Sequence, residues 1–469
     1  MAILNQILAT GVISYVCTTM GIMYTWPSFT LKLFSSTNTT LDRVMTETEL
    51  ALLGSISSIS AIIITPFSSY FIDTLGRKWC CIVFYMAQLI GWVVVIIWYT
   101  VEAVLFAMFL SGLSACMMLV IPIYVSEYCQ ECIRGSMTSG SMIFLGIGML
   151  FSYLLGGLLE YKAMNYTGLT LTILGFVAFS FMKESPLFLM QKGRETEAAR
   201  SIAFYRGLKI GSKEVLQEIE NIKRTMNPDI EGTEDTPREE EKLNPEGPKK
   251  KLSPWKYLVK SRSSRRALIL SIMLYTTSIF QGLIVVQVYA EPLFEKAVPT
   301  MSAMVSSILF AIVAVIAGFI GAYLIDLIGR RPLLMYASFA TGISCAVLGS
   351  QIHLNWGPSW LTAVFMHVYC VTYVVGAGTV PYVIVAEIFL PEIKSFASMV
   401  AVEWAFACNF VILFIFNPLV NLVGLGPVFY LFSVVCFLTV VYCYYYLPET
   451  KCLPVDAMQK RFLKRANLL

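Results

Sequence analysis

The chain has 469 residues, of which 57% are hydrophobic and 14% are charged, and its formal net charge is +4. One water-soluble core of this length cannot bury so much apolar surface, so the composition excludes a soluble globular protein. A helix that crosses a bilayer needs about 20 apolar residues. Twelve segments meet this requirement, and we predict an all-α polytopic membrane protein of twelve transmembrane helices. They span 7–29, 50–70, 80–99, 102–125, 138–158, 166–182, 266–289, 302–324, 332–352, 360–386, 397–420 and 426–447.

The first apolar stretch begins at Ile3, without a basic leader or a small-residue cleavage site, so we expect a retained helix. A polar segment then separates six apolar segments from the other six. Its residues 195–226 have the apolar spacing of short amphipathic helices, and residues 227–253 lack apolar anchors and are expected to be mobile. The predicted domains are a bundle at 1–182, a cytoplasmic loop at 183–265, a bundle at 266–447 and a cytoplasmic tail at 448–469.

Basic residues predict the orientation of the chain. An even number of spans places both termini on the same side of the membrane. Of the 34 lysines and arginines, 30 fall on that side and four fall on the other: Lys32, Arg43, Lys162 and Lys296. The positive-inside rule then places both termini in the cytoplasm. Two N-glycosylation sequons, at Asn38 and Asn165, fall in loops assigned to the outside. We expect a multi-pass protein of the plasma membrane and, as a working assumption, a monomer.

Catalytic and cofactor motifs are not found in the sequence. There is no nucleotide-binding glycine loop of the Walker type, no metal-ligand cluster and no nucleophile with a supporting base. We therefore predict that the protein is not an enzyme, that it uses no cofactor or metal and that it binds no nucleic acid. Its predicted partners are the lipid bilayer and a small-molecule solute.

The two halves of the sequence share three features in the same order. A turn with Asp73, Gly76, Arg77 and Lys78 recurs 253 residues later, Glu127 with Arg134 recurs after 260, and Glu184 recurs after 265; the later copies are Asp326, Gly329, Arg330, Arg331, Glu387, Lys394 and Glu449. Nearly constant offsets indicate a duplicated six-helix unit. Such duplication is common in secondary transporters, whose repeats form a central site.

The repeated charges have a chemistry that suits a gate. Glycine permits a tight turn between two helices, and the following cations can reach carbonyls and carboxylates at neighbouring helix ends. The alternative is ordinary positive-inside anchoring, which a single turn would satisfy equally well. Because the turns recur together with the acidic residues, we predict a cytoplasmic gate made of Asp73, Arg77, Lys78, Glu127, Arg134, Glu184, Asp326, Arg330, Arg331, Glu387, Lys394 and Glu449.

These residues carry a family resemblance over nearly the whole chain. The sequence resembles the sugar porter family of the major facilitator superfamily, and within it the insect facilitated trehalose transporters. The matching pieces include Tyr24 to Pro27, Ser69 to Lys78, Pro122 to Tyr124, Glu184 to Pro186, Asp326 to Arg331, Gly378 to Pro381 and Pro448 to Lys451. The resemblance implies two pseudo-symmetric six-helix bundles and transport of a sugar such as trehalose or a hexose by alternating access.

The resemblance also implies where a sugar would bind, and here the sequence departs from the family. Most of its polar ligand positions are replaced: they fall at Met142, Ser278, Ile279, Ile284, Ala314, Tyr382, Ala405 and Phe406. Asn409 matches the family residue. Replacement ligands are available at Gln281, Gln287 and Tyr289, and Trp26 could stack on a sugar ring or form part of the aromatic belt. The predicted solute-binding residues are Gln281, Gln287, Tyr289, Tyr382, Asn409 and Trp26.

Glu403 is an acidic residue about 10 Å inside a predicted span, where carboxylates are functional candidates by default. Its helical direction differs from that of Asn409, which favours a structural or gating partner over proton coupling. Nothing in the sequence requires ion coupling, so passive transport is the main prediction. The alternatives are a transport-poor nutrient receptor on the same scaffold and a proton-coupled carrier of another small polar solute.

Overall fold

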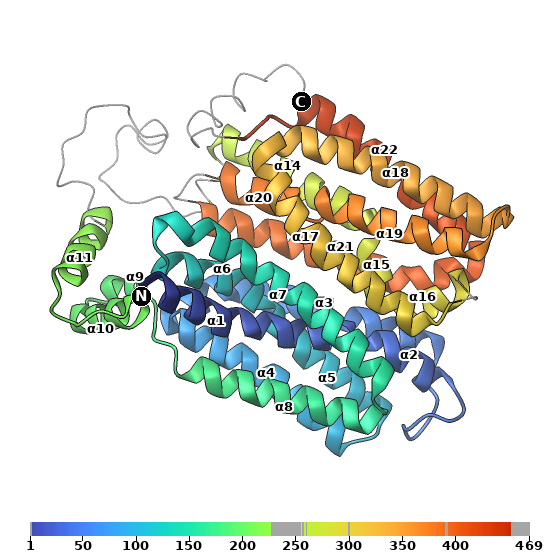
Figure 1. The fold of residues 1–469 in the computed structure, drawn as a ribbon, viewed down its shortest axis with the longest axis horizontal. Helices are drawn as coiled ribbons and strands as arrows, with labels where there is room; N and C mark the ends of the chain where they lie inside the picture. Colours follow the sequence, from blue (N-terminus) through green and yellow to red (C-terminus); the bar gives the residue numbers. More distant parts are fainter. Residues whose placement is uncertain are drawn as a thin grey trace. The chain divides into compact units, whose positions relative to one another are not determined.

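The computed structural model describes residues 2–226, 255, 258, 260–298, 301–389 and 393–451. All secondary structure in these ranges is helical (Figure 1). Ten helices within them are long and apolar enough to cross a membrane, and the apolar stretch Ile143–Leu158 adds a shorter one. Large apolar side chains such as Ile316 and Phe319 remain exposed along these helices. Exposed apolar faces of this extent suit hydrocarbon better than water.

The chain divides into two compact units. The first unit comprises Met1–Trp26, Thr40–Arg43 and Phe67–Asp235, and the second comprises Pro27–Thr39, Val44–Pro66 and Thr236–Leu469. Helix α3 (Glu47–Leu75) belongs to both, because the division falls directly after Pro66, a proline inside this helix. A proline removes one helical hydrogen bond and is a common place for a helix to bend.

The first unit is a helical bundle with short helices at one end. The bundle is made of α1 (Ala2–Thr25), α4 (Arg77–Ile97), α5 (Val101–Leu113), α6 (Met117–Tyr128), α7 (Glu131–Leu158) and α8 (Tyr161–Ser180). Helix α1 packs on α7 and α8, and α4 packs on α5 and α8. The short helices are α9 (Pro186–Gln191), α10 (Glu195–Arg206) and α11 (Lys213–Met226), of which α10 contacts α1 (Figure 1). Helices α10 and α11 lie within the segment 195–226, for which the sequence predicts short amphipathic helices.

The second unit contains the other helices. They are α2 (Pro27–Ser35), α14 (Arg262–Phe280), α15 (Leu283–Val288), α16 (Ala290–Ala297), α17 (Ala303–Ile328), α18 (Arg330–Leu354), α19 (Ser359–Val375), α20 (Val380–Ile388), α21 (Lys394–Val423) and α22 (Leu425–Tyr446), together with the first part of α3. Helix α18 packs on α22 and α19, α14 packs on α21, and α16 contacts both α17 and α2.

Each predicted apolar segment coincides with a helix or with consecutive helices, and four of the segments are divided. The fourth span covers α5 and α6, and the tenth covers α19 and α20. The predicted seventh span divides into α14 and α15 because Gly282 has φ 91°, a conformation that ends a helix. The first span ends at Thr25, and the chain resumes as α2 from Pro27. The segment predicted to be mobile, 227–253, lies outside the described residues. The predicted domain boundaries stay a prediction. The compact units differ from them, because the second unit also contains residues 27–39 and 44–66 from the first half of the sequence.

Candidate functional site

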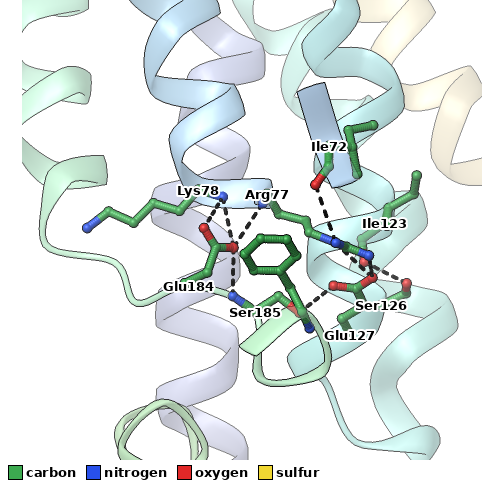
Figure 2. Close-up of polar contacts among 9 residues, drawn as sticks. Ile72, Arg77, Lys78, Ile123, Ser126, Glu127, Glu184 and Ser185 are labelled. Atoms are coloured by element: carbon green, nitrogen blue, oxygen red, sulfur yellow. Dashed lines mark hydrogen bonds and ion pairs between the residues drawn. The ribbon is translucent and has the colours of Figure 1, made fainter. Parts of the chain in front are cut away.

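The first cationic turn lies between α3 and α4 and encloses a carboxylate. Gly76 has φ 91°, and a side chain there would come within 2.5 Å of Glu184 Oε2. The backbone N–H of Arg77 donates to Glu184 Oε1 at 2.9 Å, and that of Lys78 reaches both carboxylate oxygens at 3.1 Å (Figure 2). Glycine is therefore required at this turn, both for its φ angle and for the space that Glu184 occupies.

The Arg77 side chain forms a buried ion pair in this turn. Its Nη2 and Nε atoms donate to Glu127 Oε1 at 2.7 and 3.1 Å, and Nη1 reaches the carbonyl oxygen of Ile72 at 3.5 Å (Figure 2). The two charged side chains are only 7% and 8% exposed. The Phe188 ring covers the guanidinium with its centroid 5.2 Å from Cζ. Removing one partner of such a buried pair costs about 3–5 kcal/mol.

Ser185 joins the two acidic residues and was not predicted. Its hydroxyl donates to Glu127 Oε2, and its backbone N–H donates to Glu184 Oε1 at 2.9 Å. The hydroxyl also accepts from the N–H of Phe188, so it caps α9. We call Arg77, Lys78, Glu127, Glu184 and Ser185 the first charge cluster.

Helix α10 holds the segment that carries Glu184. The Tyr205 hydroxyl donates to the carbonyl oxygen of Lys183 at 2.6 Å and lies 2.8 Å from the Tyr124 hydroxyl. The Tyr205 ring stacks on Tyr128 with centroids 4.2 Å apart. Ser201 donates to the carbonyl oxygen of Glu184. The amphipathic helix thus fixes the position of the acidic residue that closes the turn.

The second cationic turn repeats this arrangement between α17 and α18. Gly329 has φ 105°, and a side chain there would lie 3.0 Å from Glu449 Oε2. The backbone N–H groups of Arg330 and Arg331 donate to Glu449 at 3.0 and 3.1 Å. The Lys451 ammonium donates to the carbonyl oxygen of Leu327 at 3.0 Å. The predicted repeat is therefore also a repeat of hydrogen bonds.

Arg330 pairs with Glu387 as Arg77 pairs with Glu127. The Nη2 atom of Arg330 lies 2.7 Å from Glu387 Oε1, and the Thr450 hydroxyl donates to Glu387 Oε2 at 2.7 Å. Asp326 approaches the same guanidinium at 3.3 Å, although its side chain is 76% exposed. We call Arg330, Arg331, Glu387, Glu449 and Thr450 the second charge cluster.

Glu449 follows the last candidate span, and hydrogen bonds from backbone N–H groups control its pKa. Burial raises the pKa of Glu449, but hydrogen bonds from the backbone N–H groups of Lys451, Arg330, Arg331 and Thr450 outweigh burial. The net pKa therefore lies below the usual value for a glutamate. The carboxylate stays charged while it holds the turn.

Three predicted gate residues are not part of these networks as described. Asp73 is exposed, and among the described residues it makes no hydrogen bond or ion pair, unlike its counterpart Asp326. Arg134 lies in α7 and Lys394 is the first residue of α21, but their side chains lie outside the described ones. Their place in the gate stays a prediction. The hydroxyls of Ser185 and Thr450 could have been found, because each follows the repeated glutamate directly.

The predicted solute residue Gln281 is fully buried at the end of α14. Its Nε2 donates to Thr439 at 3.2 Å and to Ser338 at 3.4 Å, and its backbone carbonyl accepts from Tyr369 at 2.7 Å. Its Oε1 atom is buried and has no partner in the described part of the chain. In this conformation Gln281 packs against helices of its own unit.

Tyr289 and Asn409 lie in different surroundings. The Tyr289 hydroxyl donates to the carbonyl oxygen of Leu413 at 3.0 Å, and its ring stacks on Phe416 with centroids 5.6 Å apart. Asn409, on α21, has a buried Oδ1 atom with no hydrogen-bond partner among the residues described. An unpaired buried amide oxygen is unfavourable and needs a donor from water or a solute. This agrees with a ligand role for Asn409.

Gln287 and Tyr382 complete the predicted solute residues of the second unit. Gln287 is half-buried on α15. Tyr382, on α20, is 56% exposed and meets the Tyr275 ring edge-on, with centroids 5.3 Å apart.

Trp26 and Asn165 are buried against each other in the first unit. The Trp26 indole N–H donates to Asn165 Oδ1 at 3.0 Å, and the Trp26 ring also packs edge-on against Trp92. The sequence predicts that Asn165 lies in a loop. In the structure it lies inside α8, and its side chain is 2% exposed. The loop prediction is wrong because the apolar α8 begins earlier than expected, at Tyr161. A buried, hydrogen-bonded amide does not suit glycosylation, whereas Asn38 is exposed.

Glu403 is half-buried within α21. No hydrogen bond or ion pair to it is found in the described ranges, so the gating partner that the sequence favours is not identified. Its role in coupling stays a prediction.

Comparison with known families gives the class of protein. The family model "Sugar (and other) transporter" matches residues 2–462. The chain therefore belongs to this family of transporters, and its family resemblance is confirmed.

Curated relatives include insect transporters of moderate similarity. The facilitated trehalose transporter Tret1 of Drosophila mojavensis is 25% identical over 453 residues, which cover 95% of this chain and 50% of the relative. Tret1 of Bombyx mori is 23% identical over 427 residues, 88% of this chain and 79% of the relative. The chain thus spans about half the length of the Drosophila protein.

Solved structures with the same fold include the xylose transporter XylE from E. coli in a partially occluded inward-open conformation. It has a TM-score of 0.76 at 17% identity and covers 95% of this chain and 98% of its own. The major facilitator superfamily proton:xylose symporter XylE bound to 6-bromo-6-deoxy-D-glucose has a TM-score of 0.73. The fold is therefore the all-α major facilitator fold, as predicted.

Proposed function

We propose that this protein is a facilitative transporter that moves a sugar, trehalose or a hexose, across the membrane by alternating access. The family match over residues 2–462 carries the proposal. The relatives' names support trehalose as one substrate to test, and a xylose transporter of the same fold supports monosaccharides as the other.

The two charge clusters supply the switching chemistry. Each holds a turn closed through backbone N–H groups that bind one glutamate and through an arginine that pairs with another. Such contacts can form in one conformation and break in another, because the broken groups regain hydration when the turn opens to water. We infer that both clusters stabilise one conformation of the transport cycle, as cytoplasmic gates.

Asn409 is the first residue that we assign to the solute. Its buried oxygen lacks a donor, which sugar hydroxyls supply in abundance. Gln287 and Tyr382 remain further ligand candidates. Gln281, Tyr289 and Trp26 are fully packed here, and a contact with sugar requires that their helices move first.

Uptake by the full chain in proteoliposomes tests the function. We expect saturable uptake of labelled trehalose or glucose that stops at equal concentrations inside and outside and does not change with a proton gradient. Empty liposomes give the background, and Glu295→Gln, at an exposed carboxylate outside both charge clusters, is the control variant. Asn409→Ala is expected to weaken uptake, with a higher KM.

The same assay separates the alternatives. Sugar binding without uptake would support a transport-poor receptor on this scaffold. Uptake that accumulates sugar only with an inward proton gradient, and that loses this dependence in Glu403→Gln, would support proton coupling. Absence of both binding and uptake would overturn a sugar function.

We also propose that the protein resides in the plasma membrane with both termini in the cytoplasm, as a monomer. The distribution of lysine and arginine supports the orientation. Epitope tags at each end, detected with and without permeabilisation, test it.

A further inference from the structure

A second polar cavity lies in the second unit, between the first turn of α3 and the end of α21. It has a volume of about 150 Å³, and its lining includes Glu47, Thr48, Phe414, Asn417, Pro418 and Asn421. None of these residues belongs to the charge clusters or to the solute residues predicted from the sequence. The cavity therefore needs an explanation of its own.

The lining follows from helix periodicity. Phe414, Asn417, Pro418 and Asn421 occupy positions i, i+3, i+4 and i+7 of α21, so they form one face of this helix. Pro418 has no N–H, so the usual helical hydrogen bond from residue 418 to the carbonyl of Phe414 cannot form. The wall of the cavity is thus more polar than an uninterrupted apolar helix would make it.

Within the described part of the chain, the polar side chains of the cavity have no protein partners. Glu47, Thr48, Asn417 and Asn421 make no side-chain hydrogen bond or ion pair with any described residue. Neighbouring Glu49 shows the contrast, because it accepts hydrogen bonds from the backbone and hydroxyl of Thr46. A carboxylate, a hydroxyl and two amides are therefore available to a molecule in the cavity.

This set of groups suits a neutral polyhydroxylated ligand. A carboxylate and amide oxygens accept from sugar hydroxyls, amide N–H groups donate to them, and the Phe414 ring offers an apolar surface to the sugar ring. The carboxylate disfavours anions. Hard cations take six or more oxygen ligands, often from several carboxylates, whereas Glu47 is the one acidic side chain among the described residues of this lining.

The size of the cavity also fits. A single water needs about 10–15 Å³ on this measure, so the cavity offers on the order of ten times that room. A sugar ring with its hydroxyls can replace such a group of waters.

We propose that this cavity is a second solute site, which binds one sugar ring at the end of α21 before or after it occupies the site of Asn409. The proposal rests on the proposed function. Asn417 follows Asn409 by eight residues, or about 12 Å along the helix axis. In the orientation proposed above, the cavity lies toward the outside, where a solute would first arrive.

Thiol protection tests the site without measuring transport. Asn421→Cys is introduced into the full chain, purified into nanodiscs and labelled with a maleimide while trehalose or glucose is titrated. Ten native cysteines are buried among the described residues, which limits background labelling. Val44→Cys is the matched control, because Val44 is 41% exposed in the same unit and does not line the cavity. Thr48→Cys repeats the test from the opposite wall should Asn421→Cys not fold.

We expect sugar to slow labelling at Asn421→Cys and not at Val44→Cys. Adding Glu47→Gln should raise the half-protecting concentration about tenfold, since hydrogen bonds to a charged group are the stronger ones. Glu295→Gln, an exposed carboxylate outside the lining, should leave it unchanged.

Equal labelling with and without sugar at both Asn421→Cys and Thr48→Cys would overturn the site, even if uptake into proteoliposomes is intact and the proposed function stands. Protection by sodium or calcium chloride and not by sugar would overturn it in favour of a cation. Sugar protection without uptake would support the site and count against transport.

Discussion

The two charge clusters have the same pattern of hydrogen bonds and ion pairs but differ in burial. In each, a positive-φ glycine precedes two backbone N–H groups that bind a glutamate, and an arginine pairs with a second glutamate at 2.7 Å. Arg77 and Glu127 are 7% and 8% exposed, whereas Arg330 and Glu387 are 12% and 32% exposed. The duplicated sequence thus fixes the hydrogen bonds, while the surroundings of each copy set how much water reaches them.

The surroundings differ at specific atoms. Arg77 uses both Nε and Nη2 on Glu127 and lies under the Phe188 ring, but Arg330 uses Nη2 and its buried Nε has no partner in the described part of the chain. A broken pair is costly only if its charges cannot hydrate. We therefore expect the first charge cluster to stabilise its closed turn more than the second.

The largest expected effect is at Arg77. Arg77→Met should reduce stability by about 3–5 kcal/mol, because Glu127 would remain buried without its cation. Arg77→Met combined with Glu127→Leu should recover most of the thermal stability in detergent but not the transport rate, if the pair acts as a gate. A single variant as stable as the original protein would contradict the burial argument.

Arg330→Met measures the second cluster in the same way. The expected loss is about 1–2 kcal/mol, because the half-exposed Glu387 can regain hydration. Thermal unfolding of both single variants side by side gives the comparison. Equal losses at Arg77 and Arg330 would show that burial does not set the difference.

Acidification probes Glu449. Because the folded-state pKa of Glu449 is lowered, its stabilisation is complete above the ordinary glutamate pKa and is lost as pH falls through the folded-state pKa. Stability of the purified protein should therefore decline on acidification, and Glu449→Gln should flatten this decline. Glu295→Gln, at an exposed carboxylate of the same unit, serves as the control. An identical pH profile for Glu449→Gln and the original protein would contradict the prediction.

The hydroxyls that support the acidic residues should have smaller effects. Ser185→Ala removes a hydrogen bond to the nearly buried Glu127 and should destabilise by about 1–2 kcal/mol, while Thr450→Val at Glu387 should cost about 0.5–1 kcal/mol. Unfolding midpoints of the two variants provide the measurement. A larger effect at Thr450 would reverse the proposed order of the clusters.

The smallest effects are expected at the exposed aspartates. Asp326→Asn weakens a contact in which Asp326 is 76% exposed, so its change should stay within about 0.5 kcal/mol. Asp73→Asn should cause no measurable change, since Asp73 makes no ion pair in the described structure. If Asp73→Asn slows transport strongly, Asp73 acts in a conformation other than this one.

Sequence alone could predict the fold and the clusters. Long apolar segments predict the helices. The repeated glycine, cation and glutamate at matched offsets mark Arg77 with Glu127 and Arg330 with Glu387 as candidate partners, although these pairs are 50 and 57 residues apart in the sequence. The hydroxyls of Ser185 and Thr450 could have been predicted as well, because each residue directly follows the repeated glutamate.

Solute contacts could not be predicted as well, because they depend on helix breaks and rotation. Gly282 ends α14, and Gln281 at that break points into packed helices toward Thr439. Trp26 is engaged by Asn165, a partner 139 residues away that periodicity does not reveal. The cavity at Asn417 and Asn421 was not predicted, because Asn417 falls within the apolar segment 397–420 and Asn421 directly follows it, although their spacing marks one helix face.

The contact between Trp26 and Asn165 limits what carbohydrate analysis of the mature protein can find. Because the Asn165 amide is engaged inside a helix, Asn38 is the sequon left for an attached glycan. Treatment with an N-glycosidase should therefore produce at most one mobility step on a gel. That single step, if present, would also report which face of the membrane Asn38 met during synthesis.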